Sequence, residues 1–180
     1  MNGPIETSPE VSISAFWNQP CYRFFHWDPS PTPFALQQVD DAIDFINNII
    51  ERQGPFDGVI GFSQGSVMAL ATMLRYAKLN PDDDPLFRFA IFFSVPYIPE
   101  KDTSGRQEEW GRIRVPSLHI CGETDELWFE SSKVTAEKNC EKGLTNVIVH
   151  KGGHVIPKDK PIVDRVIDAI EDLLDKADSM

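Results

Sequence analysis

The chain has 180 residues, and its proportions of apolar (41%) and charged (25%) residues are ordinary for a globular protein with a hydrophobic core. Its net charge of −11 argues against a nucleic-acid or an anionic-membrane partner, because both repel an acidic surface. No stretch reaches the roughly 18 consecutive apolar residues that a transmembrane helix needs. The first residues do not have the pattern of a signal peptide.

The three cysteines, Cys21, Cys121 and Cys140, are odd in number and irregular in spacing. They predict free thiols in a reducing compartment and, together with the lack of a signal peptide, a cytoplasmic protein. No group of cysteines and histidines has the spacing of a zinc site, so we expect neither a metal nor another cofactor.

Residues 1–34 are rich in proline and aromatic side chains and show no persistent helical or strand period. A segment this long and irregular is either disordered or functional, and its aromatic content disfavours disorder. It is predicted to be an arm that packs over the core; a compatible interpretation makes it the apolar wall of a substrate pocket. For that wall we expect the side chains of Trp17, Phe24, Phe25 and Trp27.

The rest of the chain alternates between expected strands and helices. Thr32-Pro33 is typical of a helix start, and the apolar period that follows predicts an amphipathic helix to about Arg52. Further elements are expected as strands at 56–62, 87–95, 115–121 and 146–150, and as helices at 64–79, 126–141 and 161–176.

This alternation predicts an α/β fold with a mainly parallel sheet flanked by helices. The run 56–62 is apolar on both faces, as is typical of a parallel strand. Residues 96–112 are polar and irregular and are a candidate lid or a surface excursion. We expect a single domain over residues 1–180, with the arm at 1–34 and the α/β core at 35–180.

Between the strand 56–62 and the helix 64–79, residues 61–65 read Gly-Phe-Ser-Gln-Gly and fit the pattern G-x-S-x-G. In a nucleophile elbow, a serine sits on a sharp strand-to-helix turn with its hydroxyl exposed above the sheet. A side chain at Gly61 or Gly65 is expected to collide with the neighbouring strand or helix, because the turn is so tight. The alternative is a glycine-rich turn in which Ser63 has no function.

A nucleophilic serine needs a base, and the base needs an orienting carboxylate. In α/β-hydrolases these follow the serine in the order acid, then histidine, and functional groups of parallel sheets lie at the carboxyl ends of strands. Asp125 follows the strand 115–121, and His154 follows the strand 146–150 after a Gly-Gly pair. We therefore predict a catalytic triad of Ser63, Asp125 and His154.

Other titratable residues compete for these roles. Glu123 and Glu126 lie in the same loop as Asp125, and His150 lies at the end of its strand with less freedom to point inward. His26 precedes the serine and His119 falls inside a strand, so neither has the expected order and location.

Residues 54–65, GPFDGVIGFSQG, resemble the elbow of the eukaryotic "family of serine hydrolases". This family includes fungal serine hydrolases, the human ovarian-cancer-associated gene 2 protein and fungal polyketide-releasing thioesterases. Residues 122–125 (GETD) and 152–157 (GGHVIP) resemble its aspartate and histidine motifs, and residues 2–4 with the arm resemble the segment after an early strand. The resemblance implies an α/β-hydrolase fold and a polyketide-like or other acyl thioester as substrate.

The sequence departs from the family at its front. Members begin with a strand that ends in a Leu-His-Gly-like motif, then a helix and another strand, and this chain starts after them. That loop normally donates one of two N–H groups of the oxyanion hole, so the N–H of Gln64 is the one expected donor. Loss of one donor typically costs about 3 kcal/mol. The strand 56–62 is then expected at a sheet edge, which either the arm or a dimer partner covers or which a longer chain would complete.

The leading hypothesis is a serine esterase or thioesterase. Ser63 attacks the acyl carbonyl, His154 transfers the proton, Asp125 holds the imidazole, and the Gln64 amide binds the oxyanion. The alternative is a weak or inactive homologue that serves as a binding or accessory protein, or a non-hydrolytic cyclase of a biosynthetic pathway. An acyl-carrier or synthase partner and a homodimer that covers the sheet edge are further expectations.

Overall fold

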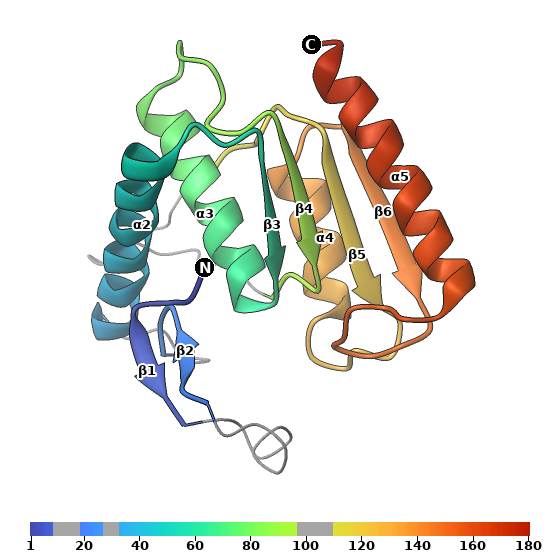
Figure 1. The fold of residues 1–180 in the computed structure, drawn as a ribbon, viewed down its shortest axis with the longest axis horizontal. Coiled ribbons are helices and arrows are strands. Elements are labelled where there is room, and N and C mark those ends of the chain that lie inside the picture. Colours follow the sequence, from blue (N-terminus) through green and yellow to red (C-terminus); the bar gives the residue numbers. More distant parts are fainter. Residues whose placement is uncertain (9–18, 27–32, 97–109) are drawn as a thin grey trace.

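The computed structural model describes residues 1–8, 19–26, 33–96 and 110–180. In these residues the structure has a parallel four-stranded sheet flanked by helices and a separate two-stranded antiparallel sheet (Figure 1). The predicted α/β class with a parallel sheet is confirmed. In chain order the elements are β1 (Ile5–Thr7), β2 (Cys21–Arg23), α2 (Pro33–Gln53), β3 (Gly58–Phe62), α3 (Gln64–Leu79), β4 (Phe89–Phe93), β5 (Ser117–Gly122), α4 (Phe129–Asn139), β6 (Thr145–His150) and α5 (Lys160–Asp178).

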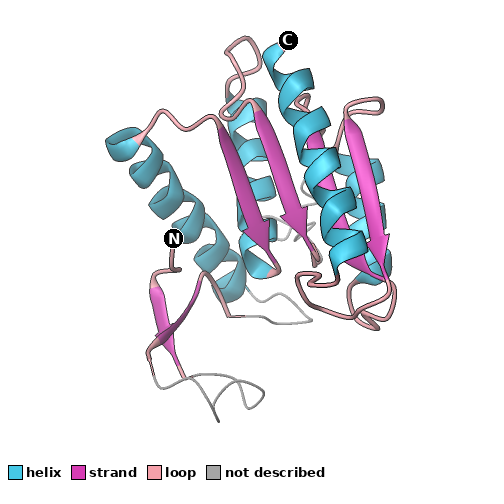
Figure 2. Cartoon of the chain, turned by 45° about the vertical axis from the view of Figure 1, so that its right-hand side comes forward, coloured by secondary structure: helices cyan, strands magenta, loops and turns pink. Residues whose placement is uncertain are grey.

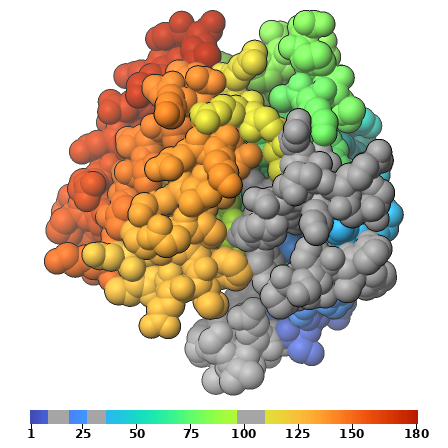
Figure 3. Space-filling view, turned by 180° about the vertical axis from the view of Figure 1, so that it is seen from behind, coloured from blue at the N-terminus to red at the C-terminus, as the bar shows by residue number. Residues whose placement is uncertain are grey.

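The helices divide between the two faces of the sheet. Alternate residues of β4 show the division, because Ala90 and Phe92 pack into a cluster with α2 and α3, whereas Ile91 packs into a cluster with α5. Figure 2 shows α5 in front of the strands, α3 and α4 behind them and α2 to the left, and Figure 3 shows the α4 segment (orange) at the surface of the rear side. The strands of this layered arrangement all run in one direction, so their carboxyl ends meet at one edge.

Helix α3 is the centre of the larger cluster. Its residues from Ser66 to Leu74 are all buried, as its nearly continuous apolar sequence predicts. Helix α2 lies against α3 through a narrower apolar stripe, and its opposite face stays polar. The stripe consists of Leu36, Val39, Ala42, Ile43 and Ile46.

Strand β3 forms an edge of the four-stranded sheet within the described residues, as predicted. Val59 faces the α3 side and is partly buried there. Ile60 pairs with Ile91 and shares the α5 face, but 66% of its surface is exposed because α5 covers β4 to β6 and not β3. The described part of the arm does not pair with this edge.

Two short strands in the arm correct the expectation that residues 1–34 have no regular structure. Strands β1 and β2 pair antiparallel, with Ile5 opposite Arg23 and Thr7 opposite Cys21. Each strand has three residues, which is too short to show an alternating sequence pattern. Trp17 and Trp27, and most of the candidate lid, lie outside the described residues.

None of the described helices is long and apolar enough to cross a membrane. The three cysteines are all unpaired.

Candidate active site

Ser63 occupies a strained turn between β3 and α3. Its backbone has φ 53° and ψ −122°, a conformation that costs a non-glycine residue about 1–3 kcal/mol and persists only where its surroundings enforce it. The Ser63 N–H donates to the Phe93 carbonyl of β4 at 2.9 Å. The Ser63 carbonyl accepts from the N–H groups of Ser66 and Val67 at 2.9 and 3.2 Å. The sheet and the first turn of α3 thus hold the serine in the conformation expected of a nucleophile elbow.

The two glycines of the motif have different roles, which corrects the sequence-based expectation. A Cβ added at Gly61 would lie 2.6 Å from both the N and Cα atoms of Ser66, so Gly61 permits the close approach of β3 and α3. A Cβ added at Gly65 would meet nothing within 4 Å. Gly65 instead borders a cavity, because the helix carries this position away from the sheet.

Asp125 is fixed by the loop between β5 and α4. Its carboxylate is buried, with 6% of the residue exposed. One oxygen, Oδ1, accepts from the N–H of Trp128 at 3.1 Å, and the Asp125 N–H donates to the Gly122 carbonyl at 3.1 Å. The second oxygen, Oδ2, is left to face His154. The turn at 126–128 explains why α4 begins at Phe129, three residues later than expected.

His154 lies between Asp125 and Ser63. Its Nδ1 is 2.7 Å from Asp125 Oδ2, and its Nε2 is 2.7 Å from Ser63 Oγ. The Phe62 ring contacts the imidazole with 5.2 Å between ring centroids. Phe62 is the variable residue before the serine in the motif, and no sequence signal distinguished it as a neighbour of the histidine. With Asp125 as acceptor, Nδ1 carries the proton and Nε2 can accept the serine proton.

The loops that carry the acid and the histidine are bonded to each other. The Glu123 N–H donates to the His150 carbonyl at 2.7 Å, and the Thr124 N–H donates to the Gly152 carbonyl at 3.2 Å. A Cβ at Gly122 would lie 2.2 Å from the Gly153 carbonyl oxygen, so only glycine allows the histidine loop to cross the end of β5. This close crossing sets the separation between Asp125 and His154.

The competing residues lie elsewhere. Glu123 and Glu126 are exposed to solvent. His150 is buried, its Nδ1 accepts from the Gly152 N–H at 3.0 Å, and burial lowers its pKa. His119 is buried inside β5, where burial lowers its pKa to about 3. His26 is exposed and contacts Arg23.

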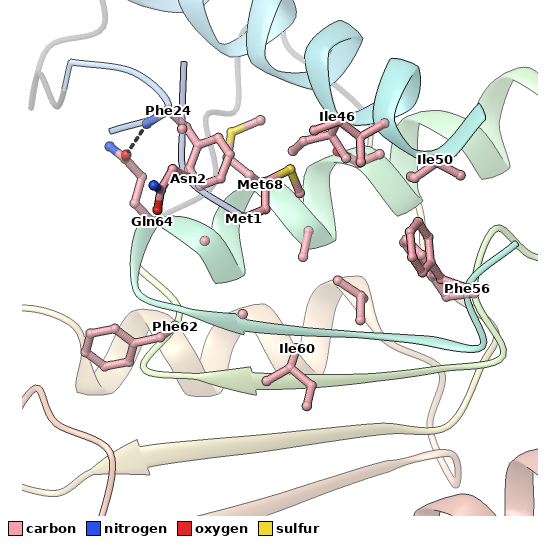
Figure 4. A pocket seen from close by; sticks show the side chains of 18 of the residues that line it. Met1, Asn2, Phe24, Ile46, Ile50, Phe56, Ile60, Phe62, Gln64 and Met68 are labelled. Atoms are coloured by element: carbon pink, nitrogen blue, oxygen red, sulfur yellow. Dashed lines mark hydrogen bonds between the residues drawn. The ribbon is translucent and has the colours of Figure 1, made fainter. Parts of the chain in front are cut away.

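Gln64 contributes both its backbone and its side chain. As the first residue of α3, its N–H has no acceptor within the helix and can bind an oxyanion. Its side-chain Oε1 accepts from the Phe24 N–H at 2.7 Å (Figure 4). Its Nε2 donates to the Phe25 carbonyl at 2.8 Å. The sequence suggested only the backbone role. Through these two bonds the side chain attaches the arm to the nucleophile elbow.

Replacing Gln64 with methionine is expected to loosen the arm and leave the elbow in place. Two hydrogen bonds of about 1 kcal/mol each would be lost, while the backbone N–H would remain. Limited trypsin digestion should then cleave after Arg23 about 30-fold faster than in the wild type, which is the factor that corresponds to about 2 kcal/mol. Gln37→Met is the matched control, because Gln37 is exposed on α2 and its bond within the described part of the chain is to Asp41. If trypsin cleaved both variants after Arg23 at the same rate, the Gln64 side chain would not be what holds the arm.

Two cavities meet at Ser63 and Gln64. One, of about 740 Å³, runs between β3, α2 and α3 and has a largely apolar lining (Figure 4). The other, of about 910 Å³, holds Ser63, Asp125 and His154. Among the expected wall residues, Phe24 lines the first cavity, whereas Phe25 is 4% exposed, belongs mainly to the core and borders the second.

Comparisons with known proteins identify the family of the chain. The model of the family "Serine hydrolase (FSH1)" matches residues 1–166. The chain belongs to this family. It is 33% identical over 175 residues to Family of serine hydrolases 3 of Saccharomyces cerevisiae, covering 95% of this chain and 64% of the yeast protein. It is 34% identical over 182 residues to Esterase FPY3 of Fusarium mangiferae, covering 94% of this chain and 78% of that protein.

The fold is also that of solved esterases. A carboxylesterase from Mesorhizobium loti matches with a TM-score of 0.56 at 20% identity, over 94% of this chain and 73% of the bacterial one. The α/β-hydrolase fold expected from the sequence is thereby confirmed. The chain spans less than two thirds of the length of the yeast serine hydrolase that it matches.

Proposed function

We propose that this chain is a serine hydrolase that cleaves an ester or thioester. Ser63 Oγ attacks the acyl carbonyl while His154 Nε2 takes its proton, and the N–H of Gln64 binds the oxyanion. His154 then gives the proton to the leaving alcohol or thiol, which leaves an acyl group on Ser63. Water, activated by His154, releases the acid and restores the serine.

One observation carries this proposal. Ser63, His154 and Asp125 form a continuous hydrogen-bonded series with both links at 2.7 Å, and the residues come from the ends of three different strands. A buried carboxylate on Nδ1 orients the ring and stabilises the imidazolium that forms as the serine loses its proton. A serine without function would not need a strained backbone aimed at this histidine.

The substrate class follows from the family and the cavity walls. Relatives are named as serine hydrolases and an esterase, and an apolar cavity adjoins Ser63, so an acyl or aromatic acyl group is the proposed substrate. A polyketide-like thioester, delivered by an acyl carrier or a synthase, is the form that the family resemblance favours.

The exposed edge of β3 favours a second candidate, a binding or accessory protein with little or no turnover. Ile60 and Phe62 are 66% and 39% exposed on an edge strand, which is a surface suited to strand addition. A homodimer formed through this edge is one such arrangement. This candidate predicts partner or ligand binding that survives Ser63→Ala, with negligible ester hydrolysis.

Labelling with a fluorophosphonate probe tests the primary proposal. The probe reacts with a serine only where a base activates the hydroxyl, so the native protein should gain the mass of one adduct on the peptide that contains Ser63. Ser66→Ala, which changes a buried serine in the same peptide, is a control that should still be labelled. An unlabelled native protein, or equal labelling of Ser63→Ala, would contradict the proposal.

A further inference from the structure

Arg23 brings a positive charge to the cavity that contains the triad. It is the last residue of β2, it is half-buried, and it lines this cavity together with Ser63 and His154. On the alternating strand, Arg23 shares a face with Cys21 and pairs across the ladder with Ile5, whereas Glu6 lies opposite Tyr22 and therefore on the other face. The nearest acidic residue of the paired strand thus points away from the guanidinium.

The guanidinium of Arg23 makes two contacts with described residues. Its Nη2 donates to the Thr7 hydroxyl, and its Nη1 lies 3.3 Å from Nδ1 of His26. Neither partner is a carboxylate, and no carboxylate of the described residues forms an ion pair with Arg23. A guanidinium has five N–H donors, and the described residues engage only its two Nη atoms, with one contact each.

The described lining of the cavity offers Arg23 no ion-pair partner. Among its described lining residues the only carboxylate is Asp125, and both oxygens of Asp125 are already bonded, to His154 and to the Trp128 N–H. An arginine with no ion-pair partner among the described residues stands out in a chain with net charge −11. A guanidinium at this position favours the binding of a ligand that carries a negatively charged group.

The two hydrogen bonds of the Gln64 side chain hold the backbone next to Arg23. The residues bonded to the Gln64 side chain, Phe24 and Phe25, follow Arg23 directly in the chain. Gln64 is also the neighbour of Ser63 and the expected oxyanion donor. Arg23 and the nucleophile are therefore linked through Gln64, because the backbone that follows Arg23 bonds to the residue next to Ser63.

We propose that Arg23 recognises a carboxylate or phosphate on the substrate, so that the enzyme prefers anionic over neutral esters. This proposal rests on the hydrolase function proposed above. The anion could lie on the acyl group, as a carboxylate at the far end of its chain, or on the leaving group, as the phosphates of a phosphopantetheine or coenzyme A thiol. Both sources present oxygen anions that a guanidinium binds through paired hydrogen bonds.

Two matched substrate pairs separate these sources. Mono-4-nitrophenyl adipate and 4-nitrophenyl hexanoate have acyl chains of equal length and differ in a terminal carboxylate. S-Butyryl-4′-phosphopantetheine and S-butyrylpantetheine share the acyl group and differ in the phosphate of the thiol. For one pair, kcat/KM should be about tenfold higher for the anionic member, as expected for one charged hydrogen-bonded contact at a half-exposed site. The pair that shows this preference identifies the source.

Arg23→Gln should abolish the preference and leave the neutral member of the pair unchanged. Arg23→Lys should retain part of it, because a lysine keeps the charge without the planar paired donors. The matched control is Arg52→Gln, which removes an equal charge at the exposed C-terminal end of α2, away from the carboxyl ends of the strands. It should behave as the wild type. A wild type without preference in either pair, or an Arg23→Gln variant that loses activity equally on both members, would overturn the proposal.

A binding measurement keeps the inference separate from the hydrolase function. If no ester is hydrolysed at all, the proposed function fails, but titration calorimetry of adipate and of pyrophosphate against the wild type and Arg23→Gln still tests the anion site. Binding that the substitution removes supports the site, and equal or absent binding in both proteins overturns it.

Discussion

Asp125→Asn is expected to lower kcat about 10⁴-fold without unfolding the protein. The asparagine Oδ1 can keep the bond from the Trp128 N–H, so its Nδ2 must face His154 in place of Oδ2. An amide N–H opposite Nδ1 forces the imidazole into the tautomer with its proton on Nε2. That nitrogen lies 2.7 Å from Ser63 Oγ and could then no longer accept the serine proton. Initial rates on 4-nitrophenyl butyrate and a far-ultraviolet spectrum would measure both parts of this expectation.

Two neighbours of Asp125 provide matched controls. Glu123→Gln and Glu126→Gln make the same chemical change in the same loop, but both carboxylates are exposed. Both variants should retain wild-type kcat. If either lost as much activity as Asp125→Asn, the acid of the site would be misassigned and the 2.7 Å contact with His154 would not describe the working enzyme.

The positions of Ser63, Asp125 and His154 could be predicted because they depend on chain order and strand ends. A parallel sheet brings the residues that follow its strands to one edge, whatever the details of packing. The expectation that β3 is an edge strand had another basis, the family resemblance, because the strands that flank this position in the family precede the part that this sequence matches. The inferences about the triad use topology alone, which a pattern of apolar and polar residues can specify.

The features that the sequence did not predict depend on contacts between distant residues. The Gln64 side chain bonds to the backbone of Phe24 and Phe25, and such a contact leaves no pattern because any residue offers the same backbone groups. Similarly, Gly122 is required by the carbonyl of Gly153, 31 positions along the chain. Both features emerge only after the loops at the strand ends have been placed relative to each other.

The arm is a second example of a feature that the sequence predicted only in part. Its aromatic content indicated packing against the core, and Phe25 is indeed buried there. Composition could not indicate that Phe24 and Phe25 would border different cavities, because that depends on the backbone direction that β2 and Gln64 impose. The arm is therefore part of the active-site wall through its backbone as much as through its aromatic rings.

Gly61→Ala is expected to destabilise the protein by about 3 kcal/mol and to lower kcat at least about 100-fold. The new methyl group would lie 2.6 Å from the N and Cα atoms of Ser66, which are backbone atoms and cannot rotate away. Either β3 or the first turn of α3 must move, and Ser63 lies between them. Urea unfolding followed by tryptophan fluorescence would measure the stability, and initial rates would measure the displacement of the nucleophile.

Gly65→Ala is the matched control, and its stability should change in the opposite direction. The added methyl group meets nothing within 4 Å, and the residue lies in the first turn of α3, where alanine is favoured over glycine by up to about 1 kcal/mol. The variant should be as stable as the wild type or slightly more stable, with its nucleophile still labelled by a fluorophosphonate. The two glycines of one motif thus separate two physical requirements, because Gly61 is needed for the close approach of backbone and Gly65 only borders the space that a substrate would enter. Equal damage from both substitutions would show that the elbow is held by something other than the contact between β3 and α3.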